Sequence, residues 1–165
     1  GWMLHLGGAS KSVAEGKLQS EQLIRSGKAL EKFRQMVQLQ GGDPRVIDDP
    51  KRLPQAQGSA QVVSGRNGFI SGMQCEQIGT ASVILGGGRE RKEDSVDPAV
   101  GIVLHRKVGD AVASGEPLAT IYYNGDERLD RARQMIATAC VIADEAPSTK
   151  RPLIHRVIQK SGEKR

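Results

Sequence analysis

Short apolar stretches separated by glycine turns dominate the second half of the sequence and limit its fold more than any other feature. Three of them follow one another directly: residues 100–105, 107–112 and 116–123. Stretches of this length, broken by Gly-Asp and Ser-Gly pairs, are typical of short strands rather than of helices. The pattern therefore predicts a small antiparallel sheet in this part of the chain.

Residues 1–47 show helical periodicity instead. The run Ser12-Val13-Ala14-Glu15 has the spacing of a capping box, and it predicts a helix that ends near Gly27. A second helix is predicted from apolar residues spaced by three and four, namely Ala29, Leu30, Phe33, Met36 and Val37. Gly41-Gly42 and the following Asp43-Pro44 end this helix, and a helical turn is expected at residues 46–47.

Residues 48–59 are rich in Asp, Pro, Gly and Ser, which predicts an exposed linker. The predicted organisation is a helical segment at 1–47 that belongs to upstream domains, a linker at 48–59 and a domain at 60–165. The chain opens with Gly-Trp-Met-Leu-His-Leu-Gly-Gly, without an initiator Met or a cap, and we expect it to continue a longer polypeptide.

Within the domain at 60–165, several further elements are expected. Residues 60–70 predict a β-hairpin around Arg66-Asn67-Gly68, and residues 76–85 predict a helix. A long helix is predicted from an apolar face of Leu129, Ala132, Met135, Ile136, Ala139, Cys140 and Ala143, and a last strand from residues 153–158. The predicted fold class is α+β, a short helical segment followed by an α/β-hammerhead, barrel-sandwich-like domain.

Composition excludes several classes of function. The net charge of +5 is modest and the charges are mixed, whereas nucleic-acid surfaces carry a stripe of one sign, so we expect no nucleic-acid partner. No run approaches the roughly 20 apolar residues of a membrane span, so we expect a cytoplasmic protein with no membrane partner. With an aromatic share of 3%, the core is expected to be aliphatic.

Cysteines and histidines form no recognisable chemical site. Cys75 and Cys140 make no CxxC motif and no cluster with the three histidines, so we expect no metal and two buried structural thiols. His5 lies among apolar residues and is expected to be a packed core histidine, while His105 and His155 lie on predicted strands. No serine–histidine–acid spacing suggests a catalytic triad.

The run Gly86-Gly87-Gly88-Arg89 is the one motif that could carry a function. Glycine turns bind phosphate at helix N-termini, but this run follows a predicted helix C-terminus, whose dipole repels anions. A helix cap with a flexible loop is the simpler interpretation. The alternative is a mobile loop that faces a cleft and presents Arg89.

Residues 101–123 resemble half of a lipoyl or biotinyl carrier domain, but the modified lysine at the hairpin tip of those carriers is missing. The longer series of motifs resembles the pyrimidine-nucleoside (thymidine) phosphorylases, most closely the bacterial members that accept both uridine and thymidine. It comprises Ser26 to Phe33, Gln40 to Pro44, Ile78 to Arg89, Lys92-Glu93-Asp94, residues 97–101, residues 101–123 and the closing Ala-Asp-Glu-Ala-Pro. The likeness keeps order and spacing over almost the whole chain.

This resemblance implies a homodimer with a helical domain and an α/β domain hinged around a cleft. It implies reversible phosphorolysis of pyrimidine nucleosides to free base and (deoxy)ribose 1-phosphate, with phosphate as co-substrate and no cofactor. The phosphate-binding and base-binding motifs of the family lie upstream of this region, so no catalytic and no substrate-binding residue is carried over. The resemblance leaves only a cleft-closure loop of Gly86, Gly87, Gly88, Arg89 and Lys92, while thymidine or uridine preference stays open.

Two other interpretations remain. A stand-alone barrel-sandwich module could bind a partner without catalysis, although the missing carrier lysine and the start of the chain argue against it. A small independent enzyme could instead use Arg89 and His105, and protection of Arg89 by phosphate would favour it.

Overall fold

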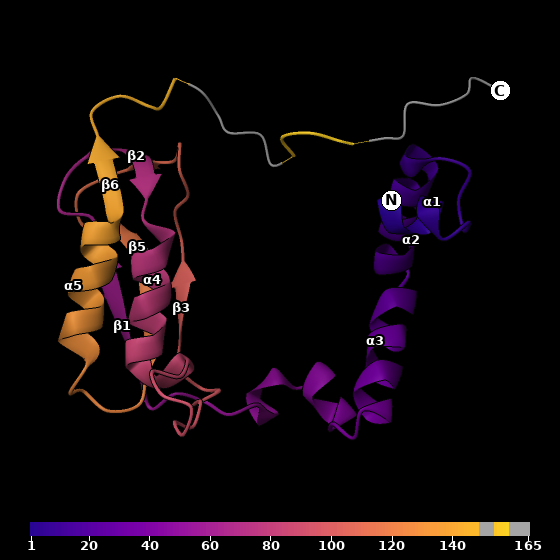
Figure 1. Cartoon of the computed structure of the whole chain (residues 1–165), viewed down its shortest axis with the longest axis horizontal. Helices are drawn as coiled ribbons and strands as arrows, with labels where there is room; N and C mark the ends of the chain where they lie inside the picture. Colours follow the sequence, from indigo (N-terminus) through magenta and orange to yellow (C-terminus); the bar gives the residue numbers. More distant parts are fainter. Residues whose placement is uncertain (149–153, 159–165) are drawn as a thin grey trace. The chain divides into compact units, whose positions relative to one another are not determined.

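The computed structural model describes residues 1–148 and 154–158, and the chain divides into two compact units, Gly1–Leu53 and Pro54–Arg165. Each unit is described by itself. Figure 1 shows the helices of the first unit and the helices and strands of the second.

Unit 1 is helical, as predicted. It contains α1 (Trp2–Leu6), α2 (Val13–Arg25), α3 (Lys28–Leu39) and two 3-10 helices, η1 (Pro44–Ile47) and η2 (Pro50–Arg52). The hydroxyl of Ser12 caps α2 by accepting from the Glu15 amide at 3.1 Å, while the Glu15 carboxylate accepts from the Lys11 amide at 2.8 Å. The predicted cap is confirmed, with the glutamate bonded one residue further back than in a capping box.

The second helix also ends as predicted. Gly41 adopts a φ of +78°, and the Gly42 amide donates to the Val37 carbonyl at 2.9 Å, which closes α3 with a left-handed cap. The turn expected at residues 46–47 is part of η1. None of the residues of α1 or α3 is buried, and Gly16 is the buried residue of α2.

Unit 2 is an α+β domain, which confirms the predicted fold class. Its elements are β1 (Gly58–Val63), β2 (Gly68–Met73), α4 (Cys75–Ser82), the π-helical turn η3 (Val83–Gly87), β3 (Gly101–Leu104), β4 (Ala111–Val112), β5 (Pro117–Tyr123), α5 (Leu129–Ala139) and β6 (Cys140–Ala143). They form two antiparallel three-stranded sheets, ordered β1-β5-β3 and β4-β2-β6. β1 starts two residues before the predicted domain boundary at residue 60.

The main core lies between the first sheet and helices α4 and α5, which pack side by side (Figure 1). It is aliphatic, as expected, and consists of Val62, Ala81, Leu85, Ala119, Ile121, Leu129, Ala132 and Ile136. A smaller cluster of Ile70, Val112, Leu118 and Cys140 is associated with the second sheet.

The predicted hairpin at residues 60–70 is wrong. Both strands form, but β1 pairs with β5 whereas β2 pairs with β4 and β6. Val62 and Ile70 belong to different core clusters, so their strands enter different sheets. The intervening turn is bonded to residues 113–116 instead, because Ser64 exchanges backbone bonds with that segment and Asn67 accepts from the Ser114 amide at 2.7 Å.

Three other elements differ from prediction. The stretch 107–112 contributes only β4, because residues 107–110 form a tight turn in which Gly109 has a φ of +97°. The long helix stops at Ala139, and Cys140 to Ala143 form β6 against β2. Of the last predicted strand, residues 154–158 are not in a strand and Leu153 lies outside the described residues.

Candidate functional site

The glycine run closes the C-terminal end of α4. Gly86 has a φ of +99°, which residues with side chains rarely adopt, so it redirects the chain within the π-helical turn. At Gly87 and Gly88 a β-carbon would lie 2.9 Å from the Ser82 hydroxyl and 2.7 Å from a Val83 methyl. The three glycines therefore permit a close return of the chain over the helix end, in agreement with the cap interpretation.

The loop that follows is anchored by two aspartates. One oxygen of Asp94 accepts from the backbone amides of Glu90 at 3.0 Å and Arg91 at 2.8 Å. The Asp97 amide donates to the Gly86 carbonyl at 2.9 Å, so the start and end of the loop are joined. The amide of Ala99 and the side chain of Asn124 donate to the Asp97 carboxylate and lower its pKa.

A hollow of about 420 Å³ lies beside this loop. It is lined by Val83, Gly86, Gly88, Glu90, Arg91, Asp94, Ser95 and Arg128. Arg128 also donates to the Ile84 carbonyl at 3.3 Å, near the C-terminal end of the helix, where a cation is favourable. Arg91 and Arg128 were not singled out from the sequence, and Arg128 reaches the loop only because α5 packs beside α4.

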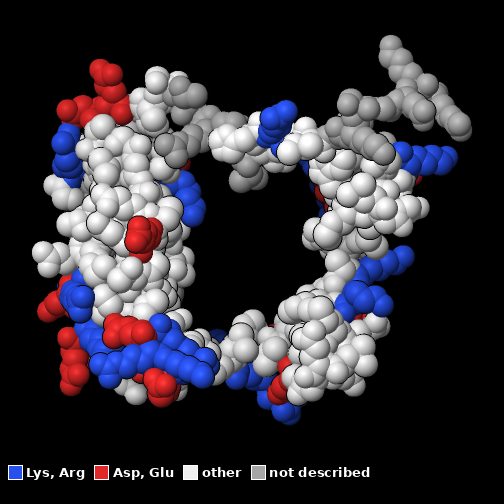
Figure 2. Space-filling model, in the orientation of Figure 1, with Lys and Arg blue, Asp and Glu red and all other residues white. Residues whose placement is uncertain are grey.

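Arg89 and Lys92, which the sequence did single out, are exposed and do not line this hollow. Neither side chain has a hydrogen-bond or ion-pair partner among residues 1–148 and 154–158. Figure 2 shows Lys and Arg gathered with Asp and Glu at the end of unit 2 where the loop after α4 lies. The surface there is mixed in sign.

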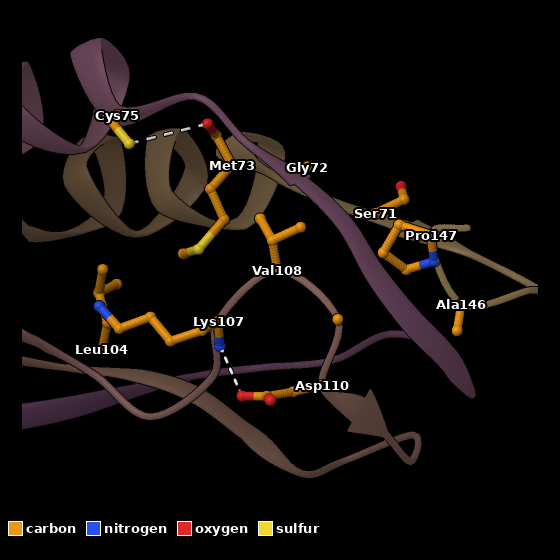
Figure 3. A pocket seen from close by; sticks show the side chains of 11 residues that line it. Ser71, Gly72, Met73, Cys75, Leu104, Lys107, Val108, Asp110, Ala146 and Pro147 are labelled. Atoms are coloured by element: carbon orange, nitrogen blue, oxygen red, sulfur yellow. Dashed lines mark hydrogen bonds between the residues drawn. The ribbon is translucent and has the colours of Figure 1, made fainter. Parts of the chain in front are cut away.

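A larger, mainly apolar cavity of about 660 Å³ lies beside β2 (Figure 3). Its wall includes Met73, Leu104, Val108, Ala146 and Pro147. Its polar groups are largely engaged: the Asp110 carboxylate accepts from the Lys107 amide at 2.7 Å, and the Ser71 hydroxyl donates to the Val141 carbonyl at 3.2 Å. Cys75 and Lys107 also line the cavity, and the Cys75 thiol donates to the Met73 carbonyl at 3.8 Å, so among the described residues no hydrogen bond joins a nucleophile to a base there.

The cysteines and histidines are dispersed. Cys140 is buried and burial raises the pKa of its thiol, but Cys75 is exposed, so the expectation of a buried thiol is wrong there. His5 is half-buried with its Nδ1 3.2 Å from the Ser10 carbonyl oxygen, and His105 is exposed beside the Thr120 hydroxyl. The part of the chain that the structure describes holds no group of three metal-ligating residues. It also holds no helix long and apolar enough to cross a membrane.

Comparison with known proteins gives a consistent result. Residues 69–143 match the model of the pyrimidine nucleoside phosphorylase C-terminal domain. The chain is similar to the pyrimidine-nucleoside phosphorylases of Bacillus subtilis (strain 168), at 41% identity, and Staphylococcus aureus (strain USA300), at 40%, each over 156 residues. These alignments cover 94% of the chain and 35% of each relative, so the chain spans about a third of the relatives' length. The resemblance drawn from the sequence motifs is confirmed.

Proposed function

We propose, because residues 69–143 belong to the pyrimidine nucleoside phosphorylase C-terminal domain family, that this chain serves as the C-terminal portion of such an enzyme. The reaction is the reversible phosphorolysis of pyrimidine nucleosides to free base and (deoxy)ribose 1-phosphate. The sequence identity of 41% over 94% of the chain carries this proposal.

The chain on its own is inactive. Phosphorolysis needs cations and hydroxyls that hold phosphate, and further cations that stabilise the negative charge developing on the leaving base. The motifs that do this in the family lie upstream of the region represented here. Within residues 1–148 and 154–158, the glycine run lies at a helix C-terminus, and its hollow is lined by the acidic residues Glu90 and Asp94 as well as by Arg91 and Arg128. That arrangement offers no uncompensated phosphate site.

The role of this chain is to support closure of the catalytic cleft. The loop of Gly86, Gly87, Gly88, Arg89 and Lys92 is held at its base by Asp97, while the side chains of Arg89 and Lys92 extend into solvent. Cations on an anchored loop can contact the domain that approaches during closure and the phosphate bound in the cleft. Arg89 thereby stabilises the closed form.

Unit 1 provides the attachment to the rest of the enzyme. Its apolar side chains are half or more exposed at Leu18, Ile24, Leu30 and Leu39, with 52% exposure at Leu30 and 88% at Leu39. Exposed apolar surface of this kind is normally covered by protein. Upstream helices of the complete enzyme cover it, and that enzyme is a cytoplasmic homodimer that uses phosphate and no cofactor.

The test is phosphate-dependent release of thymine from thymidine and of uracil from uridine. The chain is assayed alone and as a chimera in which it replaces the matching part of the Bacillus subtilis relative. Activity in the chimera and none in the chain alone is the expected result. Activity of the chain alone, or a folded but inactive chimera, would contradict the proposal.

The same chimera tests the loop. Arg89→Ala should lower kcat about tenfold, since one charge-assisted contact in the closed form is lost. Arg133→Ala is the control, because Arg133 lies on the exposed side of α5 with Asp130 as its neighbour. If the Arg89→Ala chimera has the same kcat as the parent chimera, Arg89 plays no part in closure.

A further inference from the structure

The amide side chain of Asn124 joins two segments that are far apart in the sequence. Asn124 follows β5 directly and is half-buried. Its Oδ1 accepts from the Gln57 backbone amide at 2.7 Å, and its Nδ2 donates to Asp97 Oδ2 at 2.7 Å. Both halves of the amide are therefore used, one in each direction.

The first of these segments is the entry of the chain into unit 2. Gln57 immediately precedes β1, four residues after the last residue of unit 1, Leu53. Its amide donates to a side chain before the strand ladder of β1 begins. The bond to Asn124 thus fixes the direction in which the chain enters β1.

The second segment is the base of the glycine loop. Asp97 accepts from the Ala99 amide at 2.9 Å with its other carboxylate oxygen, and its own amide donates to the Gly86 carbonyl at 2.9 Å. Asp97 consequently sets the spacing between Gly86 and the strand β3 that follows. A displacement of Asp97 moves the end of the loop that carries Arg89.

We propose that Asn124 is a positioning residue that ties the junction between the two units to the Gly86–Lys92 loop. The path runs from the Gln57 amide through Asn124 to Asp97 and from the Asp97 amide to the Gly86 carbonyl, by three hydrogen bonds of 2.7 to 2.9 Å. A change in the backbone direction at residues 54–57 displaces the Asn124 side chain, which also holds Asp97 at the base of the Gly86–Lys92 loop. This inference rests on the proposed function, in which the Gly86–Lys92 loop stabilises the closed form of the catalytic cleft.

The test measures backbone amide exchange by NMR in the 165-residue chain. Asn124→Ala should speed exchange of both the Gln57 and Asp97 amides about tenfold, because both segments lose their bonded partner. Asp97→Ala should speed exchange at position 97 and, by a smaller factor, at Gln57, because Asn124 then loses one of the two partners that hold its amide in place. An unchanged Gln57 amide in Asp97→Ala would mean that the two bonds are independent. These two patterns differ in a way that general destabilisation would not produce.

Asn67→Ala is the matched control. The Asn67 side chain also accepts a hydrogen bond from the backbone amide of a distant residue, Ser114, at 2.7 Å, but among residues 1–148 and 154–158 it bonds neither to the glycine loop nor to Gln57. Its loss should speed exchange at Ser114 and leave Gln57 and Asp97 unchanged. If Asn67→Ala speeds exchange at Gln57 and Asp97 as strongly as Asn124→Ala does, the proposed link is overturned.

A second variant guards against misfolding of Asn124→Ala. Asn124→Asp keeps the shape of the side chain and an acceptor, but it removes the donor to Asp97, so the Asp97 amide should exchange faster. The link would be overturned if Asn124→Ala speeds exchange at Gln57 but not at Asp97. It would also be overturned if the Asp97 amide exchanges at an unchanged rate in both Asn124 variants.

The kinetics of the chimera separate this inference from the proposed function. Asn124→Ala in the chimera should lower kcat with little change in KM, since no substrate contact is removed. Coupled exchange with unchanged kcat would leave the physical link in place and remove its role in closure.

Discussion

Unit 1 and unit 2 contain similar kinds of apolar side chain but place them very differently. Every buried apolar side chain of the described residues lies in unit 2, from Val62 to Cys140, and Ile121 and Ile136 are fully buried. In unit 1 the buried residues are Ser10 and Gly16, while Phe33 keeps 48% of its surface exposed. The difference shows that helical periodicity is enough to form helices but does not by itself supply a core.

The two units are also held by different kinds of interaction. Local signals define unit 1: the Ser12 cap, the left-handed Gly27 between α2 and α3, and the bidentate pair of Arg34 with Asp48. Exposed ion pairs of this kind contribute little to stability. Unit 2 depends on strands and helices that are distant in sequence, so its stability should respond far more strongly to the loss of one core side chain.

Ile121→Ala is expected to have the largest effect. Ile121 is fully buried in the middle of β5, so the substitution leaves a cavity and should cost unit 2 about 2–5 kcal/mol of unfolding free energy. Phe33→Ala in unit 1 should cost less than about 1.5 kcal/mol, because the ring is already half in water. Urea unfolding is followed by Trp2 emission for unit 1 and by the methyl signals of Ile136 for unit 2.

Equal losses from these two substitutions would mean that unit 1 has a core of its own after all. A change in the Trp2 transition caused by Ile121→Ala would show that the two units unfold together.

Gly86→Ala should have an intermediate effect. A β-carbon at Gly86 meets only Asp97 at 3.8 Å, so the cost comes from the positive φ and should be about 1–2 kcal/mol of unfolding free energy. Gly27→Ala places the same strain in unit 1, where no core holds the junction of α2 and α3 in place, and should cost less. Gly79→Ala is the control, because this helical position has open space and alanine should stabilise α4 by roughly 0.5–1 kcal/mol.

A Gly27→Ala loss as large as that of Gly86→Ala would contradict the view that unit 1 relaxes locally. Destabilisation by Gly79→Ala would show that the helix face near Gly79 is not open.

Acidification should have the smallest effect, and in unit 1 it should act through Asp43 and Asp48, since hydrogen bonds from Arg45 and Arg34 lower the pKa values of these two carboxyl groups. The Arg45 guanidinium, followed by the Arg45 backbone amide, lowers the pKa of Asp43 to about 2. Because the folded pKa lies below the unfolded value of about 4, the contribution to stability is complete above that value and is lost as the pH falls toward 2. Asp43→Asn should reduce the pH dependence of the urea midpoint detected by Trp2 in this range, while the part due to Asp48 remains.

The transition of unit 2 should keep its own acid response in the Asp43→Asn variant, because in that unit the pKa values of Asp97 and Glu116 are also lowered by hydrogen bonds. An unchanged slope for unit 1 would show that the Asp43–Arg45 contact is not maintained in solution.

The sequence alone was sufficient for local features. Caps and turns depend on neighbouring residues, so the boundaries of α2 and α3 were predicted from Ser12, Gly27 and Gly41, and the helix that runs into Gly86 was predicted as well. The resemblance to pyrimidine-nucleoside phosphorylases was also recognisable from ordered motifs. These features are encoded within a few residues, where spacing determines which groups can bond.

Tertiary structure alone decided how these pieces are combined. Residues 60–70 look like a hairpin, but the two core clusters draw Val62 and Ile70 into separate sheets. Cys140 and Ala143 continue the apolar periodicity of α5, yet they lie in a strand that pairs with β2. Arg128 and Asn124 gave no local signal, and they reach the glycine loop only through packing. Sequence periodicity predicts which side chains are buried. Which segments pair with one another depends on contacts between residues that are distant in the sequence, and these contacts exist only in the folded chain.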